Sequence, residues 1–197
     1  MEIPMNVQVQ CADGDAGHSV CVILDPVKDQ VTHLVVRESG LFSTERLVPI
    51  DIILETTHDA IKLKCTLSEL REMESFTETE FIPSADEGTY LWPYYPTMDP
   101  GIVAIEHECI PKDELAIRRG DTVYALDGSI GRVDEFLIDP TNDSVTHLIM
   151  REGHLWGRRD VTIPVSQIDR FESDTVYLKL TKKQVEELPT IPVKRRA

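Results

Sequence analysis

The residues of this chain that could do chemistry occur singly, and none of them forms a known catalytic set. Gly17-His18-Ser19-Val20-Cys21 comes within one residue of the nucleophile elbow, in which a serine stands on a sharp turn between a strand and a helix. Its fifth residue is Cys, and we expect the segment to begin a β-strand. We therefore predict no catalytic residue and classify the protein as a non-enzyme.

Metal ligands are also present without a full set. His33 and His147 each stand inside a Val-Thr-His-Leu segment, with no second ligand at a suitable spacing. Glu106-His107-Glu108-Cys109 contains ligand types, but neighbouring side chains of an extended segment point apart. Asp13-Gly14-Asp15 begins like a calcium loop but lacks its later acidic ligands. We expect structural histidines, no metal site, no cofactor, and cysteines that behave as small hydrophobes.

These residues belong to a sequence that occurs twice. Asp13 to Glu38 and Asp127 to Glu152 align at a constant offset of 114 residues, with 12 identities over 26 positions. The shared features are a Gly-x-x-Gly hinge, an Asp-Pro turn and the Val-Thr-His-Leu segment. Further on the offset becomes 115, where Pro49 pairs with Pro164. The chain is interpreted as a tandem of one small unit.

Each unit is predicted to be mainly β, because its apolar residues fall in short β-branched runs between turn residues. The expected strands are 6–11, 18–25, 31–38, 46–49, 52–56 and 60–65 in the first unit, and 122–126, 132–139, 144–152, 161–164, 168–172 and 175–180 in the second. A short helix follows in each unit, since Thr66-Leu67-Ser68-Glu69 and Thr181-Lys182-Lys183-Gln184 are capping boxes.

The expected organisation is two repeats joined by a linker. Repeat 1 covers residues 1–75, an acidic linker rich in proline and aromatic residues covers 76–112, repeat 2 covers 113–190, and a basic tail covers 191–197. A unit of this size buries only about 60% of its unfolded surface, so we expect the repeats to pack together. A monomer with an internal pseudo-twofold axis and a homodimer both stay open.

The order of these segments resembles the PRC-barrel domain, and it does so twice. The hinge, the Asp-Pro turn, the histidine strand, the Val-Pro or Ile-Pro strand and the last strand with its helix follow in the order of that family. The resemblance implies two small, partly open antiparallel β-barrels, as in the cytoplasmic part of the photosynthetic reaction-centre H subunit and the C-terminal domain of the small-subunit ribosome maturation factor. Those relatives use the barrel as a docking surface.

Charge restricts the partners that the protein can have. The chain has 35 acidic and 20 basic side chains, and a formal net charge of −15. Such a surface repels phosphate backbones and anionic lipids, so direct nucleic-acid binding is not expected. The sequence contains neither a run long enough to span a membrane nor a secretory leader pattern, and the expected location is the cytoplasm.

The candidate partner-binding residues are Phe42, Trp156, Arg158, Arg159, Trp92, Tyr94 and Tyr95. The first two align at the tip of the hairpin after the histidine strand, where an aromatic ring either contacts a partner or folds back onto the protein. The two arginines stand beside the second tip. The last three belong to an apolar, proline-rich segment of the linker, which packs either across both barrels or against a partner.

The function expected from these features is a non-enzymatic protein-binding or scaffold module with a protein partner. The alternative is an RNA-processing or ribosome-associated assembly factor, which rests on the family resemblance and on the less acidic second repeat.

Overall fold

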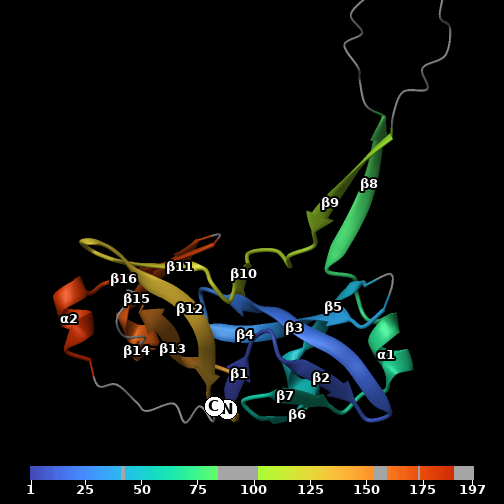
Figure 1. Ribbon diagram of the computed structural model, residues 1–197, viewed down its shortest axis with the longest axis horizontal. Coiled ribbons are helices and arrows are strands. Elements are labelled where there is room, and N and C mark those ends of the chain that lie inside the picture. The colour runs from blue at the N-terminus through green and yellow to red at the C-terminus, as the bar shows by residue number, and fades with distance from the viewer. Residues whose placement is uncertain (41–42, 84–101, 153–158, 173, 189–197) are drawn as a thin grey trace, which may run out of the picture.

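The computed structural model describes residues 1–40, 43–83, 102–152, 159–172 and 174–188 (Figure 1). This part of the chain is mainly β, as expected, with two seven-stranded sheets and a separate two-stranded hairpin. Its two short α-helices are α1 (Leu67–Glu72) and α2 (Lys182–Glu186). They lie at opposite ends of the molecule (Figure 1).

The two large sheets have the same strand order. The first runs β5-β4-β3-β2-β7-β6 and the second β14-β13-β12-β11-β16-β15. The strands of the first are β2 (Gln8–Cys11), β3 (Gly14–Asp25), β4 (Gln30–Glu38), β5 (Glu45–Pro49), β6 (Ile53–Thr56) and β7 (Ala60–Leu63), and it is extended by β10 (Leu115–Arg118). Those of the second are β11 (Thr122–Ala125), β12 (Gly128–Ile138), β13 (Val145–Glu152), β14 (Arg159–Pro164), β15 (Ile168–Glu172) and β16 (Thr175–Leu178), and it is extended by β1 (Glu2–Pro4). Each of the twelve strands expected from the sequence has an observed counterpart.

The expectation of purely antiparallel barrels was wrong in one respect. β2 pairs with β7, and β11 with β16, in the parallel direction. In the described residues no strand pair joins the two ends of either sheet, so both sheets are open. The direction of strand pairing could not be predicted from the sequence, because apolar and polar residues alternate in the same way in parallel and antiparallel strands.

The second glycine of each Gly-x-x-Gly hinge lies against the neighbouring strand. A Cβ atom on Gly17 would stand 1.9 Å from the carbonyl oxygen of Arg37, and one on Gly131 would stand 2.5 Å from that of Arg151. These distances are far below a van der Waals contact, so only glycine permits the approach of the two backbones.

The aspartate directly before each Gly-x-x-Gly hinge accepts a hydrogen bond from the first turn of a helix. The backbone N–H of Leu67 donates to Asp13 Oδ1 at 2.8 Å, and that of Lys182 donates to Asp127 Oδ1 at 2.8 Å. Both helices also have the complete capping box expected from the sequence. The orphan amides at the two helix starts are therefore bonded in the same way.

Each sheet receives its additional strand from the other half of the chain. β1 pairs with β12 and places Ile3 opposite Phe136, while β10 pairs with β3 and places Ile117 opposite Val22. The residue pairs of the two exchanges correspond to each other when 114 is added to, or subtracted from, the residue numbers. Ile3 and Ile117 are fully buried. The sequence comparison did not indicate these strands, because both lie before the segments that align, which begin at Asp13 and Asp127.

The two sheets also meet through reciprocal hydrogen bonds at their turns. The N–H of Val31 donates to the carbonyl of Asp143 at 3.1 Å, and the N–H of Val145 donates to that of Asp29 at 2.7 Å. Both aspartates have a positive φ, 53° for Asp29 and 56° for Asp143. Aspartate tolerates this left-handed conformation better than most residues.

We expect one cooperative unfolding transition for the whole protein, because one hydrophobic core cluster contains residues of both sheets and each sheet holds a strand from the other half. Scanning calorimetry would then give a calorimetric enthalpy equal to the van't Hoff enthalpy. Two well-separated transitions would contradict this expectation.

Candidate functional site: an exposed arm and the cavity at its base

A two-stranded hairpin projects from the first sheet, and we call it the arm (Figure 1). It consists of β8 (Thr77–Pro83) and β9 (Ile102–Glu108), which pair only with each other among the described strands. The described side chains of 78–82 and 104–108 are all exposed. They include three large apolar residues, Phe81 at 70%, Ile82 at 38% and Ile105 at 38% exposed.

The root of the arm is fixed to the first sheet. Phe76 is fully buried in a small apolar cluster that also contains Cys21, Ile23, Val35, Leu47 and Ala116. Its N–H donates to the carbonyl of Glu45 at 2.8 Å, and its own carbonyl accepts from Cys109 N–H at 2.6 Å. The arm is therefore anchored at one end, while its strands are open to solvent on both faces.

A cavity of about 430 Å³ lies where the arm meets the first sheet. Its polar lining comes from the arm, from β4 and β5, and from β10, and includes Arg37, Glu45, Thr77, Glu106, Glu108 and Arg118. Arg37 donates to Glu45 Oε1 at 2.6 Å, and Arg118 donates to Glu108 Oε1. Because glutamates pair with both arginines, the described lining of the cavity lacks the free positive charge of an anion site.

Arg118 links the exchanged strand β10 to the arm. Burial by itself would lower the pKa of Arg118, but the hydrogen bond to Glu108 raises it, and the net shift is upward. The backbone N–H of Arg118 donates to Asp121 Oδ2 at 2.7 Å. Burial raises the pKa of Asp121.

The structure describes little of the partner-binding residues expected from the sequence. Phe42, Trp92, Tyr94, Tyr95, Trp156 and Arg158 lie outside the described residues. Arg159 is the first residue of β14, opposite Glu152, and only its backbone is described. The roles of these seven residues stay predictions. The linker aromatics belong to the segment that connects β8 to β9.

The histidines singled out in the sequence are partly buried strand residues. His33 in β4 stands opposite Pro49, and its Nδ1 lies 3.0 Å from Thr32 Oγ1. His147 has the equivalent place in β13, opposite Pro164. On the arm, His107 Nε2 lies 3.4 Å from Glu80 Oε2 across the two strands.

Three of the four cysteines are buried, as expected of small hydrophobes. Burial raises the pKa of Cys21 to about 12. Burial and the neighbouring Cys65 thiol, 3.7 Å away, raise that of Cys11 to about 12. Both residues are therefore neutral thiols at physiological pH, the form that does not act as a nucleophile.

The arm is the main feature that the sequence did not indicate, because residues 76–112 read as one proline-rich linker. A signal was present. Thr77 to Ile82 and Ile102 to Ile105 are rich in β-branched residues, and two such runs are typical of paired strands.

The second sheet and its helix define a small, mainly β domain with one open sheet. Residues 119–185 match the PRC-barrel domain family. The match begins directly after β10 and ends in α2, so it covers all six consecutive strands of that sheet. No second copy is detected in the rest of the chain. The family consists of small β domains that often act in protein interaction or assembly. No curated protein shows significant similarity to this chain.

Proposed function

We propose that this protein is a non-enzymatic binding or scaffold module, in which two PRC-barrel-like units form the base and the arm contacts a protein partner. The observation that carries the proposal is the arm itself, an anchored hairpin with apolar side chains exposed on both faces.

The first sheet is, in this proposal, a second PRC-barrel-like unit related to the first by an internal pseudo-twofold axis. Three features support this relation. Both sheets have the same strand order, and each receives a strand from the other half of the chain in the same register. Both halves also contain a glycine hinge and a capped helix at equivalent positions. The joined units would serve as a rigid platform that holds the arm in one direction.

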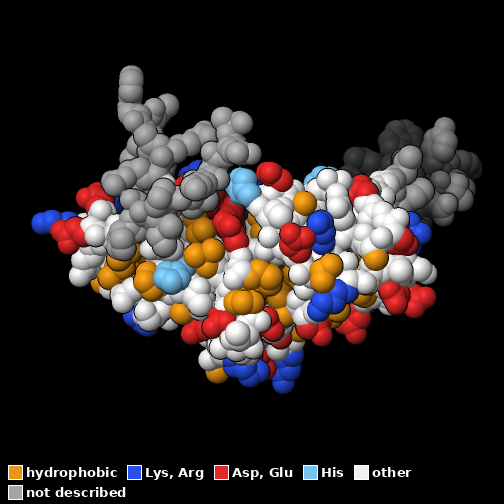
Figure 2. All heavy atoms as spheres, turned by 90° about the horizontal axis from the view of Figure 1, so that it is seen from below, with side chains coloured by type: hydrophobic (Ala, Val, Ile, Leu, Met, Phe, Trp, Pro, Cys, Tyr) orange, Lys and Arg blue, Asp and Glu red, His pale blue; other side chains and the backbone are white. Residues whose placement is uncertain are grey.

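The exposure of the arm supports a contact with another protein. A two-stranded hairpin is only marginally stable in water by itself, and exposed apolar side chains such as Phe81 and Ile82 add no stability there. Apolar groups that stand together on a surface are typical of an interaction site. On the uncovered part of the face opposite the arm, hydrophobic side chains form separate groups among charged and polar ones (Figure 2).

The free backbone edges and the charge of the arm define the kind of partner segment that it can bind. Each strand of the arm has an outer edge that pairs with no other described strand, and an extended peptide can add to such an edge. Four exposed acidic side chains lie along the arm, Glu78, Glu80, Glu106 and Glu108. The proposed partner is therefore a protein with an extended segment that is basic near the root of the arm and apolar further out.

No helix in the described part of the chain is both long and apolar enough to span a membrane. The proposal includes no catalytic step, and it assigns the protein to the cytoplasm.

The proposal predicts that Phe81→Ser combined with Ile105→Ser removes partner binding. Affinity purification from the native cell should recover the partner with the unaltered protein and at least tenfold less with the double variant. Thermal stability should change little, because substitutions at such exposed positions usually alter it by about 0.5 kcal/mol or less.

Leu54→Ser is the matched control, since Leu54 is 63% exposed but stands in β6, away from the arm. It should retain the partner. Equal recovery with the arm variant and the control would contradict a binding role for the arm. Recovery of ribosomal proteins that depends on RNA would instead favour the ribosome-associated alternative.

A further inference from the structure

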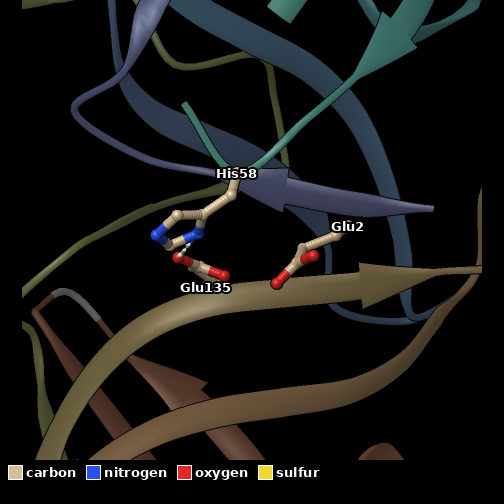
Figure 3. Close-up of side chains that lie close together, drawn as sticks. All are labelled: Glu2, His58 and Glu135. Atoms are coloured by element: carbon tan, nitrogen blue, oxygen red, sulfur yellow. Dashed lines mark ion pairs between the residues drawn. The ribbon is translucent and has the colours of Figure 1, made fainter. Parts of the chain in front are cut away.

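Three side chains that could bind a metal ion meet at the junction of the two halves. Glu2 belongs to β1, His58 to the turn between β6 and β7, and Glu135 to β12. One ligand atom of each lies within 4.8 Å of the other two. The three side chains converge on one small space (Figure 3). In the described residues no other group of three or more such side chains meets this condition.

The distances suit a shared cation better than a direct hydrogen bond. His58 Nδ1 stands 3.9 Å from Glu135 Oε1, which is beyond hydrogen-bond range. Zinc bonds to nitrogen and oxygen are about 2.0 to 2.2 Å long, which places neighbouring ligand atoms roughly 3.3 Å apart in a tetrahedral site. A small side-chain movement would therefore bring both atoms onto one ion.

The imidazole presents a suitable ligand atom. His58 Nδ1 is shielded from solvent and makes no hydrogen bond within the described part of the chain. A buried imidazole nitrogen normally has a hydrogen-bond partner, and coordination of a metal is another way to use its lone pair. The atom faces Glu135, whose residue is only 3% exposed.

The other strand exchange shows that the fold does not require charged residues here. At the 114-residue offset, the counterpart of Glu2 is Ala116 and that of Glu135 is Cys21. Both counterparts are buried and uncharged. Burial of a carboxylate is costly, and the first exchange contains the buried Glu135 with the half-buried Glu2 beside it, while the other contains no carboxylate. This difference points to a function that only the first exchange performs.

We propose that Glu2, His58 and Glu135 form a binding site for a divalent transition metal ion, with Zn²⁺ as the preferred ion. One imidazole and two carboxylates are typical Zn²⁺ ligands, whereas Mg²⁺ and Ca²⁺ prefer sets made only of oxygen. Two carboxylates balance the charge of the ion, and three protein ligands leave a position for water. The bound ion joins the β6–β7 turn of the first sheet to β1 and β12 of the second.

This proposal replaces the sequence-based expectation of a protein without a metal site. It is independent of the arm and of its partner, so either proposal can fail without the other.

The test is calorimetric titration of Zn²⁺ into the full-length, chelator-treated protein without a histidine tag. We expect one ion per chain. At a free Zn²⁺ concentration of 100 times the Kd, the melting temperature should rise by about 5 to 10 °C. Glu135→Gln and His58→Ala should each weaken binding by at least about 10-fold, and their melting temperatures without metal would show that they are folded.

His107→Ala is the matched control, because His107 and Glu80 form another histidine and glutamate pair on the arm. It should bind Zn²⁺ like the unaltered protein. The proposal is overturned if the folded protein binds no Zn²⁺, or if His58→Ala and Glu135→Gln bind it with unchanged affinity. An equal affinity for Mg²⁺ would overturn the preference for a transition metal.

Discussion

Gly17→Ala is expected to lower the free energy of unfolding by about 4 kcal/mol or more, at the upper end of single substitutions. The added Cβ would lie 1.9 Å from the carbonyl oxygen of Arg37 and 2.9 Å from the backbone nitrogen of Ser39. Both contacts are with backbone atoms, which move only if strands β3 and β4 separate. Gly17 also has a φ of 126°, which an alanine rarely adopts.

Gly120→Ala is the control variant, because it has the cost of backbone strain without the cost of a steric clash. Gly120 has a φ of 101°, but an added Cβ would have no atom within 4 Å. Its cost should be that of strain alone, roughly 1 to 2 kcal/mol. Urea denaturation of both variants measures the difference, and equal losses would show that the close approach of β3 and β4 does not matter.

Asp134→Ala is expected to destabilise the protein by about 3 to 5 kcal/mol, because it leaves two arginines without their shared counter-ion. Asp134 is 1% exposed. Arg119 Nε donates to its Oδ1 at 2.7 Å, and Arg151 Nη2 lies 3.0 Å from both carboxylate oxygens. The arginine side chains are only 30% and 28% exposed, so water does not fully replace the lost carboxylate.

An exposed pair provides the control for this prediction. Arg170 and Asp169 lie 3.0 Å apart with about half of each side chain exposed. Asp169→Ala should therefore change the stability by less than about 1 kcal/mol. In chemical denaturation, a loss for Asp134→Ala as small as that for Asp169→Ala would contradict the structural role of the buried carboxylate.

The sequence alone was sufficient for the features that depend on neighbouring residues. Strands such as β3 and β12 follow from their apolar runs, and the helix starts at Thr66 and Thr181 follow from capping boxes only four residues long. The hinges at Gly17 and Gly131 were also visible, because the second copy of the motif marks them as required. In each case the pattern that carries the prediction is a short stretch of consecutive residues.

The tertiary structure decided which segments meet. The exchange of β1 and β10, the parallel pairs and the arm all depend on which segments pair with each other, and no local pattern specifies that choice. Glu2, His58 and Glu135 are also distant from one another in the chain, and Glu2 joins the other two because β1 crosses to the second sheet. Local patterns specify the face that each strand buries, but the choice of its neighbour depends on the packing of the whole core.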